Sequence, residues 1–112
     1  MGSIQDELYS QADREVARRI LLGTEKLNES STGWQEMPDG NSKMVLYYDH
    51  SNDKERILVS AMQEELLPLS LPLAKMEDKT LPLSGLNNMR TVIIQVATGE
   101  LEAFKNRGIG GR

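Results

Sequence analysis

The chain has 112 residues and a formal net charge of −4 at pH 7, which is the size of one small domain with an acidic balance. It contains no cysteine, which excludes disulfides and thiolate chemistry, and its negative charge disfavours non-specific binding to nucleic acid or to an anionic membrane. Aromatic residues make up only 4%, so we expect an aliphatic core in which the six methionines fill irregular gaps. No apolar run reaches about 20 residues and no secretory signal pattern is present, which predicts a cytoplasmic protein without membrane contact.

Residues 4–27 carry the pattern of an amphipathic helix. Apolar residues recur at every fourth position and line one face: Ile4, Leu8, Ala12, Val16 and Ile20. Ser3 is the expected N-cap, because its hydroxyl can accept a hydrogen bond from the first turn. Gly23 either ends this helix or is tolerated inside it at a cost of about 1 kcal/mol.

The opposite face of this helix is rich in arginine. Acidic residues are interleaved with the arginines, and pairs such as Glu15 with Arg19 favour a solvated face. The alternative is a cationic patch that contacts a phosphate or an acidic partner, assisted by arginines near the C-terminal end of the sequence. The candidate anion contacts are Arg14, Arg18, Arg19, Arg107 and Arg112.

Residues 43–62 are predicted to form the central element, a β-hairpin. Two short apolar runs, 44–48 and 57–61, flank the polar loop 49–55, and both runs are rich in β-branched or aromatic residues. Both faces of each run carry apolar side chains, so we expect cover on both sides of the hairpin.

A strand over residues 33–37 is expected to precede this hairpin and to pair with residues 43–48. Pro38 begins a turn between them, because proline presets the first turn dihedral and Gly40 tolerates positive φ. Trp34 is interpreted as an anchor in or beside the core rather than as a binding platform.

Residues 91–97 form the strongest predicted strand, since they are apolar on both faces apart from one glutamine. Two interpretations are open for residues 99–107. Alternating apolar residues favour a hairpin turn into another strand. The alternative is a short helix that is capped by Thr98 and ends at Gly108.

The tripeptide Leu-Pro-Leu occurs three times, at residues 67–69, 71–73 and 81–83. Proline excludes a long helix and the middle of a sheet, so this region is expected to be extended, as an edge strand or as a loop over the core. Leucines at alternate positions then share one face, which this chain or another must cover. The candidate interface residues are Leu67, Leu69, Leu71, Leu73, Leu81 and Leu83.

The loop 49–55 has the ligand pattern of a metal site only in part. Oxygen-bearing side chains alternate as in the first half of a calcium loop, but Lys54 stands where that loop needs glycine and Ser60 where it needs glutamate. His50 is the sole histidine, and without cysteine it cannot form the usual zinc site. We interpret the loop as a polar hairpin tip with a solvated histidine, and we expect no metal, no cofactor and no catalytic residue.

These patterns together predict a single α+β domain over residues 1–104 and a flexible Gly/Arg tail over residues 105–112. The N-terminal amphipathic helix is expected to pack on an antiparallel β-meander or small β-barrel of about five or six strands. Because no credible active site or small-molecule site is evident, we predict a non-enzymatic protein–protein interaction or assembly module. It is expected to be homo-oligomeric or to bind another protein, for example as a structural subunit of a virion. The alternative is a small regulator that binds nucleic acid or another anion through its arginines.

Overall fold

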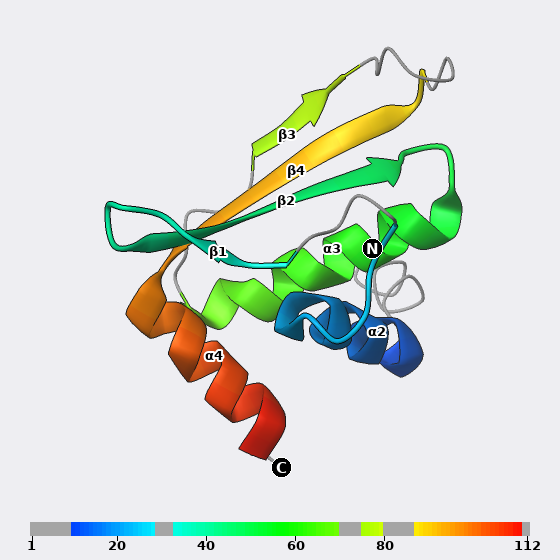
Figure 1. Ribbon diagram of the computed structural model, residues 1–112. Helices are drawn as coiled ribbons and strands as arrows, with labels where there is room; N and C mark the ends of the chain where they lie inside the picture. The colour runs from blue at the N-terminus through cyan, green and yellow to red at the C-terminus, as the bar shows by residue number, and fades with distance from the viewer. Residues whose placement is uncertain (1–9, 29–32, 70–74, 80–86, 111–112) are drawn as a thin grey trace.

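The structure is a computed structural model that describes residues 10–28, 33–69, 75–79 and 87–110. Over these ranges the chain forms helices and an antiparallel sheet (Figure 1), so the predicted α+β class is confirmed. The α-helices are α2 (Gln11–Leu22), α3 (Asp53–Leu66) and α4 (Thr98–Gly110), and a 3-10 helix, η1, spans Leu67–Leu69. The strands are β1 (Gln35–Glu36), β2 (Asn41–Asp49), β3 (Lys75–Asp78) and β4 (Met89–Ala97).

The sheet is open, and its strand order is β1-β2-β4-β3. Strands β2 and β4 form its centre and pair over their whole length, from Asn41 opposite Ala97 to Asp49 opposite Met89. β1 pairs with β2, as predicted for residues 33–37, and β3 forms the other edge. Because β4 lies between β2 and β3, the sheet is neither the predicted meander nor a barrel, and the described residues form four strands rather than five or six.

The turn between β1 and β2 has the predicted chemistry. The N–H of Met37 donates to the carbonyl of Asn41 at 2.7 Å, and Gly40 takes a φ of +84°, which favours glycine. The hydroxyl of Thr98 donates to the carbonyl of Gly40 at 3.0 Å. The same turn therefore holds the first residue of α4.

Residues 57–61 lie in helix α3, so the second half of the predicted central hairpin is wrong. The buried side chains of α3 fall on one face at helical spacing: Leu58, Val59, Ala61, Met62 and Leu66. The helix begins after Asn52, whose side-chain oxygen accepts from the N–H groups of Lys54 at 3.0 Å and Glu55 at 3.3 Å. This cap and an apolar stripe that continues to residue 66 outweigh the strand preference of the short run.

Helix α4 replaces the turn and strand that were favoured for residues 99–107, so that interpretation is wrong and the helical alternative is right, although Thr98 is the first residue of the helix and the helix continues past Gly108 to Gly110. Leu101 and Phe104 are 3% and 0% exposed, and their spacing of three places both on the helix face that meets the core. The helix also includes residues 105–110, which were predicted to belong to a flexible tail.

Helix α2 is the described part of the predicted N-terminal helix. It begins after Ser10, whose hydroxyl oxygen accepts from the N–H of Asp13 at 3.1 Å, while the expected cap at Ser3 lies outside the described residues. Gly23 ends the helix with a φ of +87°, and its N–H donates to the carbonyl of Ile20 at 3.0 Å. Of the two roles expected for Gly23, the structure therefore shows the C-cap.

Trp34 has the anchoring role that was predicted. Its half-buried ring packs against the core. The indole N–H donates to the carbonyl of Leu21 at 2.6 Å. Because Leu21 lies in the last turn of α2, this bond satisfies a carbonyl that has no partner inside the helix.

All three described helices lie on one side of the sheet, as Figure 1 shows. In β2 fully buried residues alternate with half-buried ones, and the buried residues share the face that meets the helices: Ser42, Met44, Leu46 and Tyr48. In β4 the same face carries Val92, Ile94 and Val96. The other face carries none of the described helices, so the cover expected on both sides is absent from the part of the chain that the structure describes.

Tyr48 is the largest of the fully buried side chains, and it lies at the end of β2 next to α3. Its hydroxyl has no hydrogen-bond partner among the described residues. Burial raises the pKa of Tyr48 above its ordinary value of 10.0, because a phenolate would lose its hydration, although Arg90 opposes this effect. The fold therefore favours the neutral phenol.

This raised pKa predicts a loss of stability at alkaline pH. The contribution is fully present below the unfolded pKa of 10.0 and is lost as the pH rises through the higher folded pKa. We expect Tyr48→Phe to remove this part of the decline, and to leave stability at pH 7 unchanged or higher, because it deletes an unpaired buried hydroxyl. Urea unfolding between pH 8 and about pH 11 measures both effects, and Tyr47→Phe on the opposite face is the control that keeps the decline. A steeper decline in Tyr48→Phe would contradict the assignment.

Candidate interaction surface

The side of the sheet that faces away from the helices is defined by alternation along three strands. We call it the helix-free face. Its members are Lys43, Val45, Tyr47 and Asp49 from β2, Met89, Thr91, Ile93 and Gln95 from β4, and Lys75 and Glu77 from β3. They share this face because side chains of a strand alternate between the two sides and directly opposed residues point the same way.

The strand register arranges these side chains in rows across the sheet. One row holds Val45 and Ile93 with Lys75 at the edge. The next row holds Tyr47 and Thr91, and it ends in Glu77. The centre of the helix-free face is therefore apolar or weakly polar, and charges lie at its edge.

The apolar side chains at the centre of this face are only partly covered, although Thr91 between them is buried, at 2% exposed. Val45, Tyr47 and Ile93 are half-buried, whereas their neighbours on the helix side, such as Leu46 and Ile94, are 0% and 1% exposed. An apolar strip on an antiparallel sheet without a layer above it is typical of a surface that another chain or segment covers. This strip was not singled out by the sequence, because residues 44–48 are apolar or aromatic on both faces of the strand.

The predicted leucine interface lies mostly outside the described residues. Of its six members, the structure describes the side chain of Leu67, which is 54% exposed. Leu67, Pro68 and Leu69 form η1 directly after α3, so the extended conformation predicted for this segment is wrong for residues 67–69. Proline is compatible with this short helix because it lies near its start, where its missing N–H is not needed. Leu71, Leu73, Leu81 and Leu83 fall outside the described ranges.

Three of the five candidate anion contacts meet around one hollow. Arg14 and Arg18 of α2 and Arg107 of α4 line a shallow space of about 460 Å³, together with Glu64, Glu65 and Pro68. Of the other two candidates, Arg19 pairs with Glu15 at 3.4 Å and with Glu25 at 2.8 Å, and Arg112 lies outside the described residues.

The two arginines that α2 contributes to the hollow, Arg14 and Arg18, are already paired with glutamates of α3. Glu65, whose side chain is 10% exposed, accepts a hydrogen bond from Arg14 at 3.1 Å and forms an ion pair with Arg18 at 2.9 Å. Glu64 lies 3.8 Å from Arg14. The cluster therefore acts first as a clamp between two packed helices, and its two acids offset most of the positive charge that an anion would need.

Glu65→Gln is expected to lower the free energy of unfolding by about 1–2 kcal/mol, because it leaves Arg18 without a carboxylate and Arg14 with only its longer contact to Glu64 in a partly buried place. Glu64→Gln is the matched control, since its longer and more exposed contact predicts a change within about 0.5 kcal/mol. Urea unfolding at low and at high salt measures both, and the loss should shrink as salt rises. Equal losses in the two variants would show that the cluster is not a clamp.

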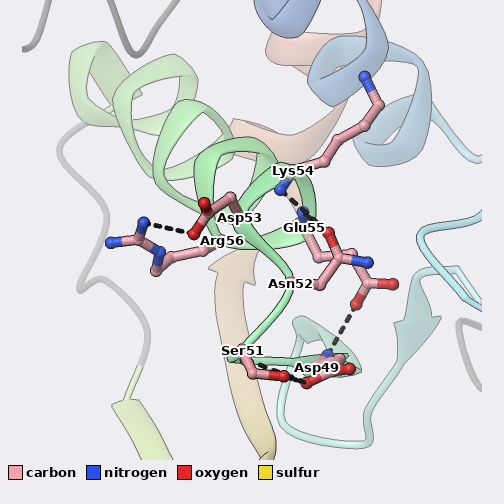
Figure 2. Close-up of polar contacts among 7 residues, drawn as sticks. All are labelled: Asp49, Ser51, Asn52, Asp53, Lys54, Glu55 and Arg56. Atoms are coloured by element: carbon pink, nitrogen blue, oxygen red, sulfur yellow. Dashed lines mark hydrogen bonds and ion pairs between the residues drawn. The ribbon is translucent and has the colours of Figure 1, made fainter.

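The loop between β2 and α3, predicted as a hairpin tip, is occupied by capping contacts (Figure 2). Asp49 accepts from the hydroxyl of Ser51 at 2.7 Å, and Glu55 accepts from the N–H of Asp49 at 2.7 Å. Asp53 pairs with Arg56 at 2.8 Å. These carboxylates are directed to the start of a helix, and the described residues contain no group of three or more His, Asp or Glu that could hold a metal ion.

His50 packs at the corner between β2 and α3. Its ring meets Tyr48 edge-on, with 6.3 Å between ring centroids and planes at 75°, and the backbone N–H of His50 donates to the carbonyl of Asn88 at 2.8 Å. Nδ1 is buried and has no hydrogen-bond partner in the described part of the chain. The histidine is therefore a half-buried packing residue rather than the solvated loop residue that was predicted.

Comparison of this chain with protein-family models, with curated proteins and with solved structures finds no match. None of the helices that the structure describes is long and apolar enough to cross a membrane.

Proposed function

We propose that this protein is a non-enzymatic interaction module that associates with copies of itself through the helix-free face. The observation that carries this proposal is the one-sided cover of the sheet: the described helices pack on one face, and Val45, Tyr47 and Ile93 remain half-buried on the other. In two-layer domains, a second layer of the same chain covers the apolar face of a sheet. The sheet of a second copy would cover this strip in the same way.

The size of the surface predicts how strong the association is. Strands of nine residues, such as β2 and β4, are about 30 Å long, and three neighbouring strands are about 14 Å wide. This footprint, about 400 Å², is roughly half of the ~800 Å² that a standard stable interface buries on each partner, and it falls in the range of weak, transient interfaces. We therefore expect an association that is reversible at micromolar concentration rather than a permanent complex.

Ile93→Lys tests the proposal, because it places a charge at the centre of the strip without touching the helix side of the sheet. We expect this variant to keep its helical content and to lose self-association. Leu67→Lys is the control, since it makes the same kind of change on an exposed leucine away from the sheet. Light scattering of both variants at equal concentration decides whether the helix-free face or the leucine segment forms the interface. Loss of association in Leu67→Lys alone would assign the interface to the leucine segment and overturn the proposal.

A further inference from the structure

The charges on the helix-free face are arranged symmetrically about one level of the sheet. Leu46, Val92 and Met76 are in register across β2, β4 and β3, and they define this level. On β3, Lys75 precedes the level by one residue and Glu77 follows it by one. On β2, Lys43 precedes the same level by three residues and Asp49 follows it by three.

We propose that two copies pack face to face about a two-fold axis that runs across the strands at this level, an inference that rests on the proposed function. Rotation about this axis reverses the direction of the strands and keeps their order. A residue that precedes the level in one copy therefore faces a residue of the same strand in the other copy, which follows the level by the same number of positions. Lys75 then faces Glu77 of the second copy, and Lys43 faces Asp49 of the second copy. Each of these four charges therefore meets a charge of opposite sign, while Lys79, just beyond β3, lies 3.9 Å from Glu77 of its own copy.

The apolar centre fits the same axis. Val45 faces Tyr47 of the second copy, so a small side chain meets a large one. Ile93 lies over the position of Thr91 of the second copy, which is already buried, so the apolar contact is made by Val45, Tyr47 and Ile93. Packed sheets lie about 10 Å apart, a distance that lysine and glutamate side chains can span together. The described contacts leave Lys75 available, while Glu77 has one long contact, at 3.9 Å, with Lys79.

Neighbouring arrangements bring like charges together or place charges on apolar groups. An axis one residue earlier would set Lys75 against Lys75 of the second copy, and an axis one residue later would set Glu77 against Glu77. An axis parallel to the strands along β4 would place Lys75 over Val45 and Glu77 over Tyr47, where the charges lose water without gaining a partner. Charge complementarity therefore selects one register, which is its usual effect at interfaces.

A charge-exchange experiment tests this register. Lys75→Glu alone and Glu77→Lys alone each create two like-charge contacts by symmetry, and we expect each to weaken self-association roughly tenfold. An equimolar mixture of the two variants restores both contacts as lysine–glutamate pairs. The mixed dimer is therefore expected to form at least as readily as the dimer of the unmodified chain. With one variant labelled with nitrogen-15, native mass spectrometry resolves the mixed dimer from the two homodimers, and thermal melting of each variant confirms that it is folded.

The control is a second mixture with the same net charges but the wrong partners. Lys43→Glu mixed with Glu77→Lys keeps like-charge contacts in this register, so no preference for the mixed dimer is expected. Equal preference in both mixtures would overturn the register and leave the proposed function standing, since net charge alone would then explain the pairing. Failure of the proposed function is distinct from this result, because the unmodified chain would then be a monomer at every concentration.

Discussion

Replacing Phe104 by alanine is expected to lower the free energy of unfolding by about 3–5 kcal/mol, the usual cost of removing a fully buried aromatic ring. Phe104 is 0% exposed and belongs to the same core as the buried residues of α2, α3 and the sheet. Its ring also lies 6.0 Å from the guanidinium of Arg107, a distance at which the attraction of a cation to a ring adds little. The loss is therefore mainly a loss of packing, and urea unfolding measures it.

Glu102→Ala is the control for this prediction, because Glu102 is an exposed residue of the same helix. We expect its effect to stay within about 0.5 kcal/mol. If Phe104→Ala were equally mild, α4 would not be docked on the core, and the interpretation of residues 99–107 as a peripheral strand would return.

A lysine at position 46 is expected to unfold the protein, whereas a lysine at position 45 is expected to leave it folded. Leu46 is 0% exposed beneath the helices, and burial of an unpaired ammonium there costs several kcal/mol, a large part of the stability of a small domain. Val45 points to the helix-free face, where the ammonium reaches water. Circular dichroism and urea unfolding of Leu46→Lys and Val45→Lys measure the difference.

The two variants differ by one position, so the comparison tests the register of the sheet. A slip of one residue would exchange the two faces and reverse the outcome. Similar stability for both variants would mean that both faces of β2 are equally covered, in contradiction to a one-sided layer of helices.

Strands with a strong local signal could be predicted from the sequence. The runs that became β2 and β4 are long, apolar and rich in β-branched or aromatic residues, and the Pro38–Gly40 turn fixes the pairing of β1. The first helix also followed from periodicity, and its end at Gly23 was one of the two roles expected for that glycine. These features depend on residues that are close together in the chain.

Helix α3 was missed and α4 was given only as the alternative to a strand, because short windows are ambiguous. Residues 57–61 resemble a strand in isolation, and only the longer stripe to Leu66 and the Asn52 cap identify a helix. In α4 the apolar positions are few, so the alternation of Leu101 with Ala103 competed with the helical pair Leu101 and Phe104. A capping residue three positions before a glutamate, as in Asn52 and Glu55, was the signal that could have corrected the first of these.

The candidate surface could not be predicted because it depends on where distant helices pack. β2 is apolar on both faces, which suggested cover on both sides. No local pattern indicates which of the two faces the helices leave uncovered. The arginines show the same limitation. Periodicity placed Arg14 and Arg18 on one helix face, but their pairing with Glu65, 51 and 47 positions later in the chain, is a product of tertiary packing.

The most direct test of self-association is the light-scattering mass of the unmodified chain over a dilution series from about 200 μM to about 2 μM, the range in which a small interface dissociates. We predict a mass near twice the monomer value of 12.6 kDa at the upper end and a fall toward the monomer at the lower end. A mass that stays at 12.6 kDa across the whole series would contradict the account, because the helix-free face would then have no second copy to cover it.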